Sequence, residues 1–378
     1  MSETIAAEPA VADAPPPFRS VFRQRLVWGL PALFTVGWFI YVTAADHWGR
    51  VADTWRTALT MLFGSFVAGS TPQGGGAVAF PVFTKVLEIT APVARTFSLS
   101  IQATGMVMAS ATIILAGRAI DKRAIAYGTG GGLIGFAIGA FVLSDPSKAW
   151  WPSYIPGPYV KVGFTVAIAA MAYIVFLCFA DGAKGHSGIT TWGLRSRLTL
   201  IGFTTLGGIA SALAGSGVDV LLFLFVVLVA GMHPRVGIPT SIITMAVVSV
   251  AGFLVFGIYD GQLAIELNHA GDVVAAGDNQ FSEPLDGERF DLFGIWLGAT
   301  PIVVWGAPLG SWVASVLPQR RLIQFVAFMA VAEVLTTIIF LDALRSDLGL
   351  VLFGIGGLVL AMVAIRVLVR TRAWIMQT

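Results

Sequence analysis

Charged residues are scarce in this sequence. Only 12% of its 378 residues are Asp, Glu, Lys or Arg, whereas 56% are hydrophobic. A water-soluble domain has about a quarter of its residues charged, so most of the surface of this chain must face something other than water. A formal net charge of +2 is also too small to indicate a nucleic-acid partner. The composition predicts a protein embedded in a lipid bilayer.

Cysteine and the common motifs of enzymes are equally sparse. Cys178 is the only cysteine, which excludes an intrachain disulfide, and the apolar run around it favours passive packing. The sequence contains no Gly-x-x-x-x-Gly-Lys-Ser/Thr phosphate loop, no His-Glu-x-x-His and no Gly-x-Ser-x-Gly. The four histidines are not spaced as metal ligands: His47, His186, His233 and His269. We therefore expect no cofactor, no metal and no enzymatic activity.

Long apolar runs, by contrast, are abundant. A helix needs about 20 mostly apolar residues to span a bilayer. About twelve candidate segments, four of them short, cover residues 27–45, 55–71, 76–91, 94–117, 124–143, 159–180, 196–214, 217–231, 236–259, 291–317, 322–342 and 348–369. The predicted fold class is an all-α, polytopic transmembrane helical bundle of about 10–12 segments.

The positions of the basic residues predict how the chain crosses the membrane, because Lys and Arg stay on the cytoplasmic side of short loops. With a cytoplasmic N-terminus, 15 of the 23 basic residues fall on that side, and the opposite orientation inverts this ratio. We therefore expect both termini in the cytoplasm and the protein in the cell (inner) membrane. The stretch 260–290 is then periplasmic, and its surplus of acidic residues indicates a solvated loop rather than a ligand or metal site.

Two glycine-rich breaks, at 69–76 and 211–219, each join two short segments without a charged loop. Matches follow in the same order: Gly74-Gly75-Gly76 with Gly215-Ser216-Gly217, Pro92 with Pro234, and Gly135-x-x-x-Gly139 with Gly306-x-x-x-Gly310. They predict a duplication. Because an odd number of segments separates the two starts, the halves are expected to be inverted, as in many secondary transporters. The alternative is a pair of packing kinks in an ordinary bundle.

The duplication predicts six parts of the chain, and each repeat is expected to contain one broken or re-entrant helix pair. The parts are a disordered cytoplasmic tail (1–26), an extra N-terminal transmembrane helix with its linker (27–54), the first repeat (55–180), a cytoplasmic linker (181–195), the second repeat with the acidic loop 260–290 (196–342), and a C-terminal helix and tail (343–378). In such a build the substrate binds where the breaks meet.

The breaks offer groups that bind anions. A helix N-terminus presents unpaired N–H groups and partial positive charge, and glycine lets a ligand approach the backbone or permits φ > 0. Bulk at the breaks is expected to block transport, whereas Gly135→Ala on a packing helix is expected to be milder. The candidate binding residues are Thr71, Gln73, Gly74, Gly75, Gly76, Ser98, Gln102, Gly215, Ser216, Gly217, Thr240 and Thr244. For each Ser or Thr the alternative is a bond to a carbonyl of its own helix.

Four ionisable residues lie within the apolar spans, where a charge is costly and therefore a functional candidate. Lys85 and Glu88 are three residues apart and can pair with each other. Asp219 and Glu333 are the candidates for proton coupling. The alternatives are that Asp219 only stabilises the start of its helix and that Glu333 is a protonated, structural hydrogen-bonding group.

The glycine, proline and small polar residues around both breaks resemble those of the TauE/SafE sulfite-exporter family. They are residues 71–81 and 92–100 in the first half, 214–219 and 233–241 in the second, and the helices of Gly135 and Gly306. The resemblance covers roughly residues 55–370. It implies transport of a sulfur-containing anion, either sulfite or an organosulfonate such as sulfoacetate, usually outward. Three features depart from the pattern: the extra first helix, the long acidic loop, and Ser216 at the position that corresponds to Gly75 of the first repeat.

The sequence therefore predicts an anion transporter that works by alternating access and is linked to the proton motive force. Its expected partners are a small anionic substrate and the lipid bilayer. The alternative is a membrane-embedded enzyme or enzyme subunit that uses the same cavity, which needs a nucleophile–base pair or a metal cluster there. A channel needs a continuous ring of coordinating groups, which a two-fold duplication does not suggest.

Overall fold

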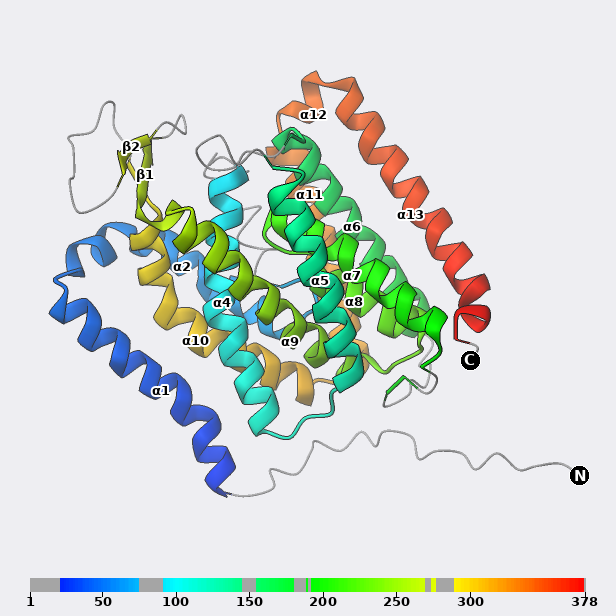
Figure 1. The fold of residues 1–378 in the computed structure, drawn as a ribbon, viewed down its shortest axis with the longest axis horizontal. Coiled ribbons are helices and arrows are strands. Elements are labelled where there is room, and N and C mark those ends of the chain that lie inside the picture. The colour runs from blue at the N-terminus through cyan, green and yellow to red at the C-terminus, as the bar shows by residue number, and fades with distance from the viewer. Residues whose placement is uncertain are drawn as a thin grey trace, which may run out of the picture.

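The computed structural model describes residues 21–74, 91–144, 154–179, 188–189, 192–268, 273–276 and 289–376. These residues form a bundle of helices with one small sheet at its end (Figure 1). The helices are α1 Val21–Ala44, α2 Trp48–Ser70, α4 Ala91–Leu115, α5 Lys122–Phe141, α6 Gly157–Phe179, α7 Leu194–Ala214, α8 Val218–Leu224, η2 Phe225–Val229, α9 Pro234–Gly252, η3 Phe253–Tyr259, η4 Gln262–Ala264, α10 Leu292–Val316, α11 Gln319–Phe340, α12 Ala343–Ser346 and α13 Leu348–Ile375. The π-helices η2 and η3 continue α8 and α9.

Seven described helices are long and apolar enough to cross a membrane: Arg25–Ala44, Pro92–Leu115, Lys122–Phe141, Leu194–Ala214, Pro234–Tyr259, Leu292–Val316 and Leu348–Arg372. Three shorter apolar helices accompany them: Ala58–Ser70, Val218–Val229 and Gln324–Phe340. They confirm the prediction of a polytopic, all-α bundle. α1 and α13 lie along opposite flanks (Figure 1), and only 17% and 11% of their spans are buried, as expected of helices that face lipid.

The predicted segments coincide with described helices except where tertiary contacts extend a helix. α2 is predicted from residue 55 but begins at Trp48. The added residues 48–54 include Arg50, Asp53 and Thr54, which break the apolar run. Nη1 of Arg50 lies 3.6 Å from Oδ1 of Asp291, directly before α10, and this ion pair stabilises the extension. The predicted segment 76–91 falls almost entirely outside the described residues, as does most of the predicted tail 1–26.

Close glycine contacts join helices of the two predicted repeats. α2 packs against α10, and α7 packs against α5. A Cβ on Gly69 would overlap the carbonyl oxygen of Ala307 in the first pair, and a Cβ on Gly135 would overlap that of Thr205 in the second. α4, which also contacts α10, packs against α9, which also contacts α5. These pairings keep their form when the two halves are exchanged, which supports the duplication.

Gly135→Ala is therefore expected to destabilise the protein, in contrast to the mild effect predicted from the sequence. The backbone of α7 occupies the position of the new Cβ, and overpacking of this kind costs about 1–3 kcal/mol. The measurement is the thermal midpoint of the purified protein in detergent. Gly130→Ala on the same helix is the control, because nothing lies within 4 Å of a Cβ there. Equal midpoints for the two variants would contradict the close approach of α5 and α7.

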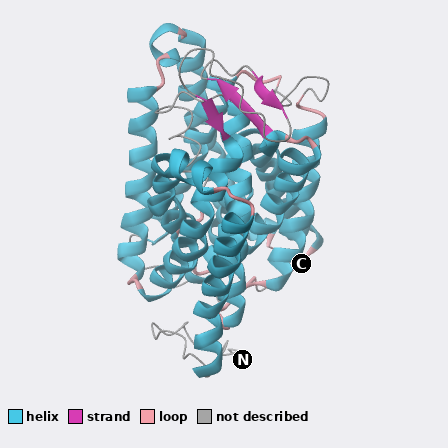
Figure 2. Cartoon of the chain, turned by 90° about the vertical axis from the view of Figure 1, so that its left-hand side faces the viewer, coloured by secondary structure: helices cyan, strands magenta, loops and turns pink. Residues whose placement is uncertain are grey.

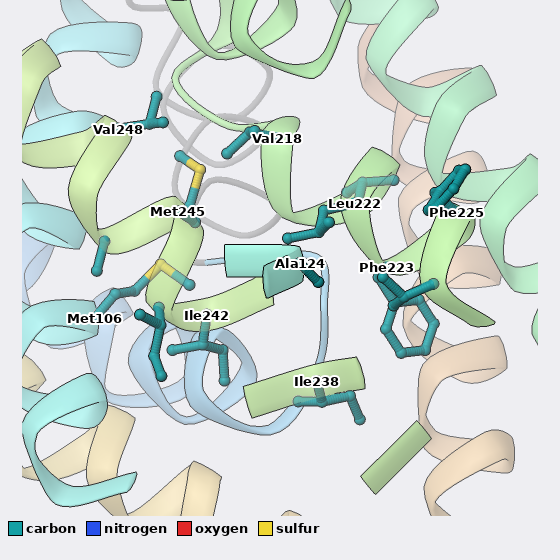
Figure 3. Packing of buried hydrophobic residues seen from close by; sticks show 14 of the residues in the cluster. Met106, Ala124, Val218, Leu222, Phe223, Phe225, Ile238, Ile242, Met245 and Val248 are labelled. Carbon is teal, nitrogen blue, oxygen red and sulfur yellow. The ribbon is translucent and has the colours of Figure 1, made fainter. Parts of the chain in front are cut away.

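The main hydrophobic core surrounds the start of α8. Figure 3 shows Val218 and Leu222 of α8 near Met245 of α9, with Met106 of α4 on the other side of α9. All four side chains are fully buried. This packing holds the residues that precede α8, which include the second predicted break, against α4 and α9.

A three-stranded antiparallel sheet, in the order β2-β1-β3, lies within the stretch that the sequence predicts as a loop. Its strands are β1 Ile265–Asn268, β2 Val273–Ala276 and β3 Arg289–Asp291. The sheet lies at one end of the bundle, and the start of α1 lies at the other (Figure 2). The sheet and the start of α1 lie at opposite ends, as the distribution of the basic residues predicts. Which end faces the cytoplasm stays a prediction.

Cysteine labelling tests that orientation. α12 lies at the sheet end and α5 begins at the other end (Figure 1). Ser346 belongs to α12 and Lys122 is the first residue of α5, and both are exposed. In a Cys178→Ala background, Ser346→Cys should react with an impermeant maleimide in intact cells and Lys122→Cys only after lysis. Labelling of Lys122→Cys in intact cells would show that the predicted orientation is wrong.

Candidate functional site

The second break is a Gly-Ser-Gly turn between α7 and α8. α7 ends at Ala214, and Gly215 follows it with φ of +80°. Gly217, with φ of +152°, precedes α8. Residues other than glycine rarely adopt either backbone conformation, which explains why glycine stands on both sides of Ser216. The break lies inside the bundle, because Ser216 is completely buried.

The first break begins where α2 ends. Thr71 and Gln73 are buried there, and Gly74 has φ of +67°. The Thr71 hydroxyl donates to the carbonyl of Val67 at 3.0 Å and accepts from the N–H of Gln73 at 3.3 Å, so it supports the turn. Two further predicted binding residues, Gly75 and Gly76, lie outside the described residues.

The two breaks touch each other. The Ser216 hydroxyl donates to the carbonyl of Gln73 at 3.3 Å. A Cβ on Gly74 would overlap Oδ2 of Asp219 and lie 2.9 Å from both Oε1 of Gln102 and Oγ of Ser216. Residues from the two halves thus meet at Gly74, and the missing side chain leaves room for the polar groups around it.

α4 supplies the next two predicted residues. Nε2 of Gln102 donates to the carbonyl of Gly215 at 2.7 Å and to Oγ of Ser98 at 2.9 Å. Ser98 donates to the same carbonyl at 3.1 Å. Both side chains therefore pair with a carbonyl that the end of α7 leaves without a helical partner. Because Gln102 uses its amide hydrogens in this way, its Oε1 faces Gly74.

Three polar atoms at the junction have no hydrogen-bond partner among the described residues. They are Nε2 of Gln73, Oε1 of Gln102 and Oδ2 of Asp219. All three side chains are at least 99% buried. Each unpaired buried polar atom costs about 1–3 kcal/mol. Oε1 of Gln102 and Oδ2 of Asp219 both face Gly74, so this place is a candidate site for a polar ligand or a proton. We call Gln73, Gly74, Gln102, Ser216 and Asp219 the junction site.

The start of α8 is not an open anion site. Oδ1 of Asp219 accepts from the N–H groups of Gly217 at 3.3 Å and Val220 at 3.0 Å. The N–H of Val218 donates to Ser211 at 3.1 Å. These groups are paired within the protein, which corrects the prediction that unpaired N–H groups at this end hold the substrate. The same contacts agree with the alternative for Asp219, although its second oxygen still faces the junction site.

Two predicted residues on α9 are held within their own helix. Thr240 donates to the carbonyl of Val236 at 2.7 Å, and Thr244 donates to that of Thr240 at 3.2 Å. Thr240 also accepts from the N–H of Asp121 at 3.1 Å, which ties it to the start of α5. In the described structure these hydrogen bonds match the local alternative, and neither hydroxyl bonds to the junction site.

Glu333 lies at the contact of α11 with α6. Its Oε1 accepts from Thr165 of α6 at 2.9 Å and from Thr337 at 3.5 Å, and the side chain is 6% exposed. These hydrogen bonds place Glu333 between a different pair of helices from those that form the junction site. Asp219 is therefore the proton-coupling candidate that the fold brings to the breaks.

The sequence analysis does not single out Arg95, although the residue lies at the start of the predicted segment 94–117. The side chain is 1% exposed in the first turns of α4, and its Cζ lies 3.8 Å from the centroid of the Phe256 ring. Its charge also acts on Asp260. Burial raises the pKa of Asp260 above the ordinary value, whereas a hydrogen bond from Gln262 and the charge of Arg95 act in the opposite direction. Pro92 is the sequence signal that could have located Arg95. Proline favours the first turn of a helix, so a helix that begins near Pro92 includes Arg95.

The comparison with known families agrees with this architecture. The family model described as "Sulfite exporter TauE/SafE" matches residues 57–337. No significant match was found among curated proteins or among solved structures. The matched residues include both breaks and every described helix from α4 to α10. The chain belongs to the TauE/SafE sulfite exporter family.

Proposed function

We propose that this protein exports a sulfur-containing dianion, either sulfite or an organosulfonate such as sulfoacetate, through the junction site. The observation that supports this proposal is that the two breaks, one from each half, meet at Gly74, where Oδ2 of Asp219, Oε1 of Gln102 and Oγ of Ser216 converge inside the bundle. Secondary transporters with duplicated halves bind substrate at such a place. The amide of Gln73 is a neutral donor suited to sulfonate and sulfite oxygens, whereas the hydroxyl of Ser216 already donates to the carbonyl of Gln73 in this closed state.

Alternating access is the transport mechanism that suits a binding site with no opening to either side of the membrane. Ser98, Gln102, Ser216 and Asp219 are all at most 1% exposed, so an anion enters only after the helices around the site move apart. The glycine contacts of α2 with α10 and of α5 with α7 link the halves through backbone packing. Such tight pairs move as units, so rigid-body rocking of one unit against the other opens the site to each side in turn.

Proton coupling is assigned to Asp219, because its Oδ2 faces the same space as the substrate. An ionised carboxylate about 4 Å from an anion is repelled by roughly 4 kcal/mol at an effective dielectric constant near 20. Asp219 must therefore be protonated when the anion is bound, and one proton leaves with each anion. A dianion with one proton carries a net negative charge outward, so a membrane potential that is negative inside drives export.

The experiment is counterflow of labelled sulfite and labelled sulfoacetate in proteoliposomes that contain only this chain. Saturable counterflow of either one is the expected result, and the preferred anion names the substrate. Counterflow of neither anion, with protein shown to be folded and inserted, would contradict the proposal. No observation favours the membrane-embedded enzyme: among the described residues no group of three His, Cys, Asp or Glu could hold a metal.

A further inference from the structure

The start of α7 presents two exposed leucines between two arginines. Leu194 and Leu198 are 71% and 59% exposed, and they lie at the beginning of a helix that is long enough to cross the membrane. At about 100° per residue, Arg195 and Arg197 lie about 80° to either side of the middle of these leucines. We call these four residues the α7 ridge. Its apolar side chains face lipid at the edge of the bilayer, with a cation on each side.

Each arginine of the α7 ridge lies on an aromatic ring of a different helix. Cζ of Arg195 is 4.4 Å from the ring centroid of Trp374 at the end of α13, and Cζ of Arg197 is 5.6 Å from that of Tyr127 on α5. The Tyr127 ring packs in turn against Trp192, with 5.5 Å between the centroids. Cation–π attraction therefore holds the two guanidinium groups on opposite sides of the ridge. Tryptophan and tyrosine are typical of the level at which lipid headgroups lie.

No carboxylate neutralises these arginines within the described part of the chain. Neither guanidinium forms an ion pair or a hydrogen bond there, and Nε of Arg197 is buried without a partner. Asp121, the acid at the start of α5, accepts instead from the N–H groups of Arg123 and Ile189, both at 3.0 Å. Guanidinium groups of this kind suit the oxygens of phosphate.

The α7 ridge lies at the end of the bundle that is predicted to face the cytoplasm. α13 runs from α12, at the sheet end, to the other end (Figure 1), and its Trp374 contacts Arg195 there. Lys122 and Arg123, both exposed at the start of α5, add positive charge at the same end. Anionic lipids give the cytoplasmic leaflet a negative surface potential, which attracts such a surface.

We propose that the α7 ridge binds a phospholipid with two phosphate groups, as in cardiolipin, with one phosphate at each arginine and acyl chains on the leucines between them. The charge of the ridge favours an anionic headgroup, and the exposed leucines favour a lipid over a soluble phosphate. A headgroup with a single phosphate reaches one arginine at a time while both arginines stay on their rings. The bound lipid thus links α7 to α5 and α13.

Native mass spectrometry of the purified full chain tests the headgroup. Tetraoleoyl cardiolipin is titrated beside phosphatidylglycerol, which has one phosphate, and phosphatidylcholine, which has no net charge. The wild type should bind cardiolipin about fivefold more tightly than phosphatidylglycerol, since a second arginine contacts a second phosphate. Arg195→Gln and Arg197→Gln should each remove this preference. The matched control is Arg25→Gln, because Arg25 is an exposed arginine at the start of the span on α1.

The control should keep the fivefold preference. A preference that survives Arg197→Gln, or binding of phosphatidylcholine as tight as that of cardiolipin, would overturn the proposal.

A second pair of variants tests whether the acyl chains lie on the ridge. Leu198→Ala should weaken cardiolipin binding severalfold, because it removes apolar surface from the site. Leu33→Ala should not, although Leu33 on α1 is just as exposed, at 70%. Inorganic phosphate at the same phosphate concentration should not displace the lipid. Displacement by inorganic phosphate, together with normal binding by Leu198→Ala, would mean that the arginines bind a soluble anion and that the lipid assignment is wrong.

Discussion

Gly74→Ala is expected to lower transport of the labelled anion by about a hundredfold at matched membrane expression. The new Cβ would overlap Oδ2 of Asp219 and crowd Oε1 of Gln102 and Oγ of Ser216, so it fills the junction site itself. A loss of roughly 2.8 kcal/mol in binding corresponds to this factor. The same measurement at Gly215 or Gly217 is less direct, because a Cβ at those positions would meet Ser98 or Ala210.

The control for Gly74→Ala must separate loss of space from backbone strain. Gly117 has φ of +65°, close to the +67° of Gly74, and lies exposed in the turn after α4. Gly117→Ala therefore introduces the same left-handed strain, about 1–2 kcal/mol, without adding an atom to the junction site. Transport by Gly117→Ala should stay within severalfold of the wild type. Equal losses in the two variants would mean that strain, not the filled site, explains the defect.

Asp219→Asn is expected to abolish accumulation driven by a pH gradient, while exchange of the anion and its response to the membrane potential survive. Asn cannot release a proton, so the site keeps the neutral form that accepts an anion but no longer couples its passage to a proton. Substrate affinity should weaken as the pH rises in the wild type, because ionised Asp219 repels the anion. In Asp219→Asn this pH dependence should be lost. Binding, counterflow and driven accumulation are measured in the same proteoliposomes.

Glu333→Gln is the matched comparison, since it neutralises the other buried carboxylate that the sequence nominates. Glu333 bonds to Thr165 on α6 and lies outside the junction site, so driven accumulation should remain close to that of the wild type. The reverse result, in which Glu333→Gln uncouples transport and Asp219→Asn does not, would transfer the coupling role to Glu333.

The prediction of helices succeeded because the bilayer imposes one requirement on each span. About 20 apolar residues must pair their own backbone groups, and that requirement is visible in any single segment. Helices α4, α5, α7 and α10 were all predicted within a few residues of their observed ends. The early start of α2 was missed, because residues 48–54 include three polar residues and are stabilised by a contact of Arg50 with Asp291 that no local pattern contains.

The candidate site could be predicted only in part. Glycine at 74, 215 and 217 was expected to permit positive φ, and all three positions have it. The prediction of free N–H groups at the start of α8 was wrong, because the neighbouring Asp219 and Ser211 side chains occupy them. The hydroxyl of Thr244 donates to a carbonyl of its own helix. Whether a hydroxyl does so depends on the residues that pack opposite it, and no sequence pattern predicts this.

By itself the sequence determined that this protein spans a membrane with many helices, that two glycine-rich breaks interrupt them, and that the family is that of the sulfite exporters. Composition and the length of each apolar run are properties of short stretches of sequence, so they can be determined without knowledge of tertiary contacts. Only the tertiary structure decided that Gly74 faces Asp219, that Glu333 lies between another pair of helices, and that Arg95 is buried against Phe256. These are contacts between residues far apart in the chain, and the packing of whole helices sets them.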